Sequence, residues 1–373
     1  MFKELYHSRL FNFILLLLFA FLFFGGLYIT RDFLVPISFA ALLAMLLLPV
    51  VTKFESWRLP KSVSIILALF ILFLILGLVI TMLSTQISGF AEDVPIIKKN
   101  MTEKIENMQG FIHQRTGVAP DKQLTMVKDR LSGMLEMGGS YAQKILAGTT
   151  GTLANFGLVV IYSFFFLSYR TRFVNFILKI TPAKDEKRTK NVIVEISKVT
   201  QNYLSGVFTV MFILAILNIT GLLIIGVRHA IFFGVLAAML NIIPYLGSFI
   251  GGLIPTIYVF ITKDSIGLVA ATGAVFITTQ FLENNFFTPL IVGSKVKVNP
   301  LATLVSLFIG SFLWGVAGMI LFIPFLGVTK IIFDNVESLE PYAYLIGGDE
   351  NSEDDNFLQK IFRKLKSKFS SKS

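Results

Sequence analysis

The feature that most constrains this chain is a series of apolar stretches, each long enough to cross a membrane. A hydrocarbon layer about 30 Å thick is spanned by roughly 20 helical residues. Five stretches reach this length with few or no interruptions: 10–29, 33–51, 63–88, 152–169 and 204–227. Residues 231–262, 265–292 and 301–333 are equally apolar but interrupted. The sequence therefore predicts an all-α, polytopic integral membrane protein with about five full spans and about eight membrane segments.

Composition excludes several other classes of protein. The chain is 54% hydrophobic with a mean hydropathy of +0.75, which a water-soluble core does not accommodate. Cysteine is absent and the three histidines are scattered, so we expect no disulfide and no metal site. No phosphate-binding glycine loop and no catalytic serine, histidine and aspartate arrangement stand out. We therefore expect neither an enzyme nor a cofactor.

The positions of lysine and arginine beside the spans predict the orientation. The loop 52–62 is basic, and residues 170–200 carry eight basic and three acidic residues, so both are expected in the cytoplasm. Both termini then lie in the cytoplasm and the membrane is the inner, cytoplasmic one. The net charge of +10 is explained by basic loops beside anionic membrane lipids, so no nucleic-acid partner is expected.

Four regions follow along the chain. Residues 1–88 form a membrane region with three spans, and 89–151 a polar, extracytoplasmic excursion with the apolar spacing of two amphipathic helices. These helices either lie on the membrane, pack on neighbouring subunits or cap their own bundle. Residues 152–335 form the transport core, and 336–373 a charged cytoplasmic tail.

Two short segments of the core repeat each other. "FFGVLAAMLNIIPYLG" (232–247) is echoed by "LWGVAGMILFIPFLG" (313–327). Proline in a helix removes a backbone hydrogen bond, and lipid does not satisfy the freed carbonyl. We therefore predict an inverted-repeat, transporter-like core with two re-entrant hairpins that enter from opposite sides, although one tilted span for 231–262 remains an alternative. The predicted breaks are Pro244, Gly247, Pro255, Pro289, Pro300, Pro324 and Gly327.

Polar side chains near these breaks are the candidate substrate or ion pathway. Glu283 is a carboxylate in an apolar segment, where ionisable groups are costly and commonly functional. Gln280 and Asn284 share its helix face by their spacing. Asn285 follows directly, and Asn241 and Tyr245 flank the first break. The competing interpretations are that Glu283 caps or bridges helices, and that Asn241 only joins two helices. Gly251 and Gly252 are expected to allow close helix contact.

The stretches "IIPYLGSFIGGLIP", "QFLENNFFTPLIVGSKVKVNPLA" and "FLWGVAGMILFIP" give the chain a family resemblance. It closely resembles the autoinducer-2 exporter family of permeases over nearly its whole length. The resemblance implies an inner-membrane, homo-oligomeric transporter, with members linked to signal-molecule efflux or to sodium/proton exchange. The family's motif residues map onto Pro244, Tyr245, Gly247, Glu283, Asn284, Asn285, Pro289 and Pro300. Ser248 stands where many relatives carry proline.

Three functions follow as hypotheses. The first is a secondary transporter that exports a small organic, signal-like solute or exchanges cations. The second, within the same class, is a sodium/proton antiporter. The third is a non-transporting membrane scaffold or sensor, with 89–151 as its recognition part. A transporter needs a polar cavity near the breaks, whereas a scaffold can pack them dry.

Overall fold

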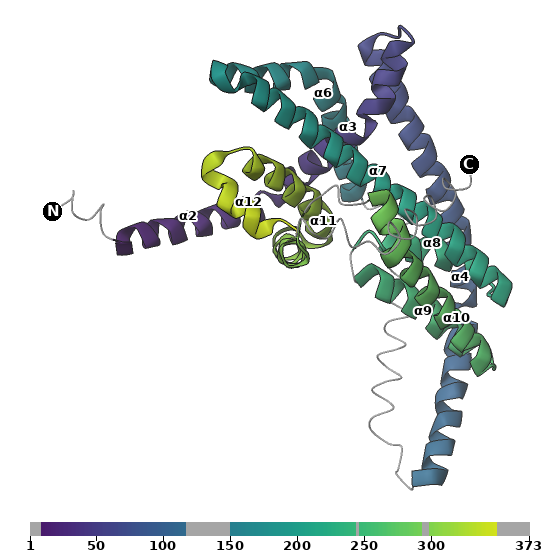
Figure 1. Cartoon of the computed structure of the whole chain (residues 1–373). Helices are drawn as coiled ribbons and strands as arrows, with labels where there is room; N and C mark the ends of the chain where they lie inside the picture. The colour runs from purple at the N-terminus through teal and green to yellow at the C-terminus, as the bar shows by residue number, and fades with distance from the viewer. Residues whose placement is uncertain (1–8, 117–149, 244–245, 293–297, 349–373) are drawn as a thin grey trace, which may run out of the picture. The chain divides into compact units, whose positions relative to one another are not determined.

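The computed structural model describes residues 9–116, 150–243, 246–292 and 298–348, and Figure 1 shows the order of its helices. Within these ranges the chain is helical apart from turns and one isolated bridge between Val298 and Gly347, which confirms the all-α prediction. The helices are α2 (Arg9–Ile29), α3 (Arg31–Ser56), α4 (Lys61–Thr116), α6 (Thr150–Ile180), α7 (Glu186–Ile225), α8 (Ala230–Leu240), α9 (Leu246–Thr262), α10 (Ile266–Leu282), the π-helix η2 (Glu283–Val292), α11 (Pro300–Asp334) and α12 (Glu340–Ile346), with short 3₁₀ turns η1 (Ala183–Asp185) and η4 (Glu337–Leu339).

Seven helices of the described part are long and apolar enough to cross a membrane, which confirms the prediction of a polytopic membrane protein. α8 and α9 are apolar but shorter. α4 has 56 residues and, at 1.5 Å per residue, is about 84 Å long. Only its first part, Lys61–Gln86, has the composition of a span. The rest of α4 therefore continues beyond the hydrocarbon layer.

The chain forms two compact units, each assembled from segments far apart in sequence. Unit 1 comprises residues 1–48, 161–205 and 292–373. Unit 2 comprises residues 49–160 and 206–291. Each unit therefore gathers pieces from several of the regions that were predicted along the chain.

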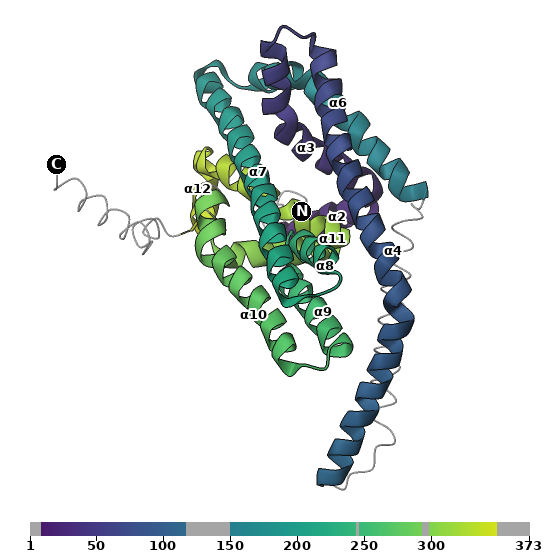
Figure 2. The same cartoon turned by 90° about the vertical axis from the view of Figure 1, so that its right-hand side faces the viewer.

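The first predicted hairpin is the centre of unit 2. α8 and α9 lie against each other, and α10 lies beside α9 (Figure 2). At Gly247 an added Cβ would come 1.7 Å from the carbonyl oxygen of Leu240, so only glycine allows this close approach. At Gly251 it would come 2.9 Å from Ala237 Cα, which confirms the predicted close helix contact.

The part of α4 beyond the span packs on this hairpin. Ile97 and Met101 of α4 are buried in one apolar cluster with Phe233 of α8 and with Tyr258 and Val259 of α9. The first part of the predicted excursion, around Ile97 and Met101, thus packs on its own unit. The predicted second helix of the excursion lies outside the described residues.

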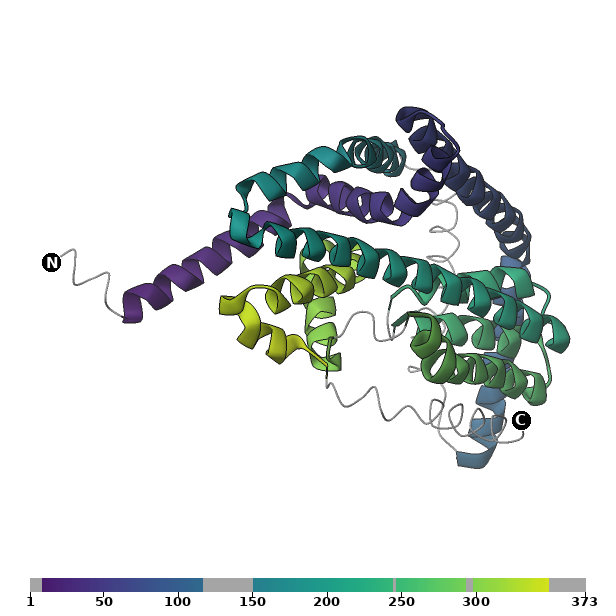
Figure 3. The same cartoon turned by 45° about the horizontal axis from the view of Figure 1, so that its top comes forward.

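The second hairpin, in unit 1, turns at a different place from the predicted one. α11 has non-helical angles at Gly315 (φ 61°, ψ −139°), and the chain folds back there. Ser306 Oγ donates to the carbonyl oxygen of Phe322 across the fold, and Gly310 and Gly318 meet backbone to backbone. The two arms of α11 are yellow-green in Figure 3.

The prediction of breaks at Pro324 and Gly327 is wrong, because both residues are buried inside the second arm of α11. Gly315 has a positive φ, which glycine adopts freely, whereas proline is fixed near the helical φ and costs mainly one hydrogen bond. Gly315 therefore makes the turn and Pro324 does not.

The other predicted breaks have mixed outcomes. Pro255 lies inside α9 and Pro289 inside η2, so neither ends a helix. Pro300 is the first residue of α11, a position where the missing N–H costs nothing. Pro244 and Tyr245 lie outside the described residues.

Candidate functional site

Glu283 lies where the helix changes its hydrogen-bond pattern, at the junction of α10 and η2. π-helical turns are rare in proteins, and those that occur often lie at functional sites. Gln280 Nε2 donates to Glu283 Oε2 at 2.5 Å and also to Asn284 Oδ1 at 3.1 Å, which confirms that the three residues share a face. Thr288 Oγ1 donates to Glu283 Oε1 at 3.4 Å from five residues along the chain.

The hairpin reaches the same carboxylate through Asn241. Asn241 caps the end of α8, and its Nδ2 donates to Glu283 Oε1 at 2.9 Å. The contact joins residues that are 42 apart in sequence. The first helix break and the membrane carboxylate therefore form one site within unit 2.

The electrostatics of the site are those of a carboxylate with neutral neighbours. Glu283 is half-buried, and its donors are two amides and one hydroxyl. In the part of the chain that the structure describes, no lysine, arginine or histidine forms an ion pair with it. A carboxylate without a fixed positive partner can gain a proton or a cation as its counter-charge.

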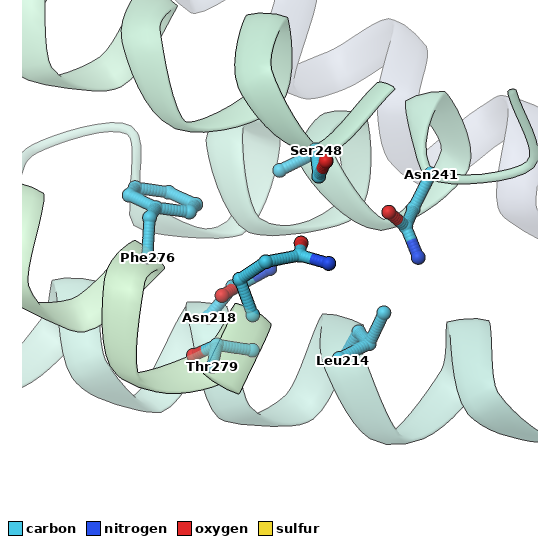
Figure 4. Close-up of a pocket in the computed structure, with 8 residues that line it drawn as sticks. Leu214, Asn218, Asn241, Ser248, Phe276 and Thr279 are labelled. Atoms are coloured by element: carbon cyan, nitrogen blue, oxygen red, sulfur yellow. The ribbon is translucent and has the colours of Figure 1, made fainter. Parts of the chain in front are cut away.

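A small cavity adjoins this network, and Figure 4 shows the side chains around it. Its volume is about 20 Å³, enough for one water molecule or one small ion. Both polar and apolar side chains line it: Leu214, Asn218, Ala237, Asn241, Ser248, Phe276, Thr279 and Gln280. Two of these, Asn241 and Gln280, also hold Glu283.

Asn218 gives the cavity its chemical character. It is 4% exposed, and its Oδ1 atom has no hydrogen-bond partner among the described residues. Buried acceptors are nearly always satisfied, so an unpaired one on a residue that lines a cavity marks a place for a donor or a cation. Amide and hydroxyl oxygens of this kind suit a hard cation or a bound water.

The remaining predicted residues are peripheral. Asn284 is exposed and accepts from Gln280, and Asn285 is exposed and donates to the carbonyl oxygen of Phe281 on its own helix.

Asn218, Thr279 and Ser248 were not predicted as site residues. In sequence Asn218 lies among apolar residues and Thr279 stands between Thr278 and Gln280, and interhelical hydrogen bonds explain such polar residues equally well. Among the described residues, no three His, Asp or Glu side chains cluster as metal ligands.

Comparison with known proteins gives consistent matches. The family model described as "AI-2E family transporter" matches residues 15–338. The chain is 26% identical over 323 residues to "Putative transport protein YueF" of Bacillus subtilis, covering 82% of this chain and 84% of YueF. It is 23% identical over 332 residues to YhhT of Escherichia coli, with the same description, covering 87% and 90%. "AI-2 transport protein TqsA" of Escherichia coli is 22% identical over 335 residues, covering 88% and 93%.

Proposed function

Because the chain belongs to the AI-2E transporter family, we propose that it is a secondary transporter with the Glu283 site on its transport pathway. Its cargo is a small organic solute of the signal-molecule kind, exported from the cell, or a cation that is exchanged. The family and its relatives support membrane transport, and the substrate and direction are our proposal.

The observation that carries the proposal is the polar cavity beside a carboxylate with neutral neighbours. Asn241 and Gln280 donate N–H groups to Glu283, which suits its ionised form. Asn218, whose Oδ1 is unpaired among the described residues, lines the same cavity and suits an occupant that donates or is positive. A site that accepts charge in one state and releases it in another is what ion-coupled transport requires.

Flux in proteoliposomes tests the proposal. We expect Glu283→Gln to abolish ion-coupled flux while insertion and assembly persist, because the amide keeps the shape but cannot change its charge. Glu195→Gln is the matched control, since Glu195 is an exposed carboxylate on α7. Normal flux of the Glu283→Gln protein at every pH would reduce Glu283 to a structural cap.

A sodium/proton antiporter is the second candidate, and Asn218 is the observation that favours it. The cavity is the size of one small ion, and Asn218, Ser248 and Thr279 supply oxygen atoms around it. An antiporter predicts that a sodium gradient alone moves protons, and that Asn218→Leu abolishes this exchange. If no gradient or solute produces flux, the scaffold or sensor hypothesis becomes the better one.

We propose further that the protein lies in the inner membrane as a homo-oligomer with both termini in the cytoplasm. The basic loops support this orientation. With re-entrant hairpins, a cysteine introduced at Ser294 should be labelled from the cytoplasm and one at Ser265 from outside. Labelling of both from one side would contradict the paired hairpins, and cross-linking in the membrane tests the oligomer.

A further inference from the structure

A second polar cluster lies in unit 2, among residues that the transport site does not use. Asp93 of α4 is the one carboxylate among the buried side chains of the described residues. Arg228 Nη1 donates to Asp93 Oδ1 at 2.9 Å, and His229 Nε2 bonds Asp93 Oδ2 at 2.8 Å. Arg228 and His229 lie in the turn between α7 and α8. The cluster thus fixes the extension of α4 to that turn.

A cavity of about 200 Å³ opens beside this cluster. Its volume is about ten times that of the cavity near Glu283. The two cavities share no lining residue. The larger one is lined by Asp93, Ile96, Ile97, Asn100, Val227, Arg228, Tyr258, Val259, Thr262 and Lys263.

The charges around this cavity leave an excess of positive charge. Among the described residues Asp93 is the only acid in its lining, and both of its oxygens are already bonded. Arg228 uses one nitrogen for Asp93, and its side chain is 69% exposed, so further N–H groups remain for another acceptor. Lys263 has no ion-pair partner among the described residues, whereas the nearby Lys104 pairs with Asp264.

We propose that this cavity binds an oxyanion, a carboxylate or phosphate group carried by a small solute or by a lipid headgroup. A guanidinium held by a buried carboxylate presents a planar pair of donors that matches such a group. Lys263 adds a second cation, and the side-chain amide of Asn100 adds a neutral donor. Ile96 and Val227 form an apolar wall for the rest of the ligand.

The absence of cysteine from the chain allows a direct binding assay. Ile96 lines the cavity and is 54% exposed, so Ile96→Cys in the full chain places one reactive thiol there without removing a donor. In phosphatidylcholine nanodiscs, inorganic phosphate or acetate should slow modification by N-ethylmaleimide at least about threefold relative to sodium chloride of equal ionic strength. Slow modification in phosphatidylglycerol nanodiscs without added anion would assign the ligand to a lipid headgroup.

Lys263→Gln in the Ile96→Cys background distinguishes anion binding in the cavity from a general effect of anions on modification of the thiol. The Lys263 side chain makes no ion pair in the described structure, so the variant should fold and yet lose most of the protection. Lys198→Gln, which removes an exposed lysine of α7, should keep it. The proposal is overturned if no anion or lipid protects the thiol, or if protection persists in Lys263→Gln.

Discussion

The Asp93 cluster predicts an unequal response to the removal of its members. Asp93 has a 10% exposed side chain, His229 a 7% exposed one, and Arg228 is 69% exposed. After Asp93→Ala, Arg228 can be solvated by water. His229 is 7% exposed, and its ring nitrogen loses the hydrogen bond to Asp93. We therefore expect Asp93→Ala to be the most damaging of the single changes.

The magnitude follows from these exposures. Breaking a fully buried ion pair typically costs about 3–5 kcal/mol. Because one partner is exposed here, we expect Asp93→Ala to lower the free energy of unfolding by about 2–4 kcal/mol, mainly through the orphaned His229. Arg228→Ala removes only an exposed cation and should cost about 0.5–1 kcal/mol. Asp93→Asn should lie between them, since its amide oxygen can still accept from His229.

Unfolding of the full chain in mixed detergent micelles, followed by loss of helical circular dichroism, measures the order of the three variants. Hydrogen exchange in nanodiscs adds a local measurement of residues 90–104. If the loss is confined to this segment, a cost of 2–4 kcal/mol corresponds to exchange about 30- to 900-fold faster in Asp93→Ala. Equal losses in the free energy of unfolding for Asp93→Ala and Arg228→Ala would refute the argument from burial.

Two further predictions concern the hairpin of α11. Gly315→Ala should cost about 1–3 kcal/mol, because its angles are costly for any residue with a Cβ, and thermal unfolding should show the loss. Gly318→Ala should destabilise by a similar amount through overpacking, since its Cβ would meet the carbonyl oxygen of Gly310 at 1.9 Å. Gly273→Ala is the matched control, as its Cβ would meet nothing within 4 Å and a helical alanine should be neutral or stabilising. If Gly273→Ala lost as much stability as either variant, the geometric argument would be contradicted.

The parts of the fold that depend on local sequence could be predicted. Spans are recognised by length and apolar composition alone, since lipid requires every backbone group to be satisfied inside the segment. Gln280, Glu283 and Asn284 were grouped correctly because helical spacing determines which side chains are neighbours. Asn241 was a candidate, but its bond to Glu283 joins two elements whose packing no local pattern encodes.

The Asp93 cluster shows the same limit more clearly. Asp93 lies in a polar stretch, 89–151, with eight basic and seven acidic residues, where a solvated side chain is the ordinary expectation. His229 is one of three scattered histidines. Only the packing of α4 on the α8–α9 hairpin brings them together. Buried polar pairs between distant elements therefore remain hidden until the packing is known.

The two similar segments of the core show why a sequence repeat did not locate both turns. Each contains a Gly-Val pair followed by proline, yet Gly315 turns its chain with a positive φ, whereas Gly234 is helical and buried in α8. A Cβ at Gly234 would come 2.5 Å from Ile219 Cγ1, so this glycine is needed for close packing. Glycine allows both a turn with a positive φ and a close helix contact because it lacks a Cβ. The residue type alone therefore does not show which of the two a glycine makes. The turn of the first segment instead falls after Asn241, next to the carboxylate that its side chain binds. The same motif thus gives one hairpin that carries a site residue and one that is closed by backbone contact.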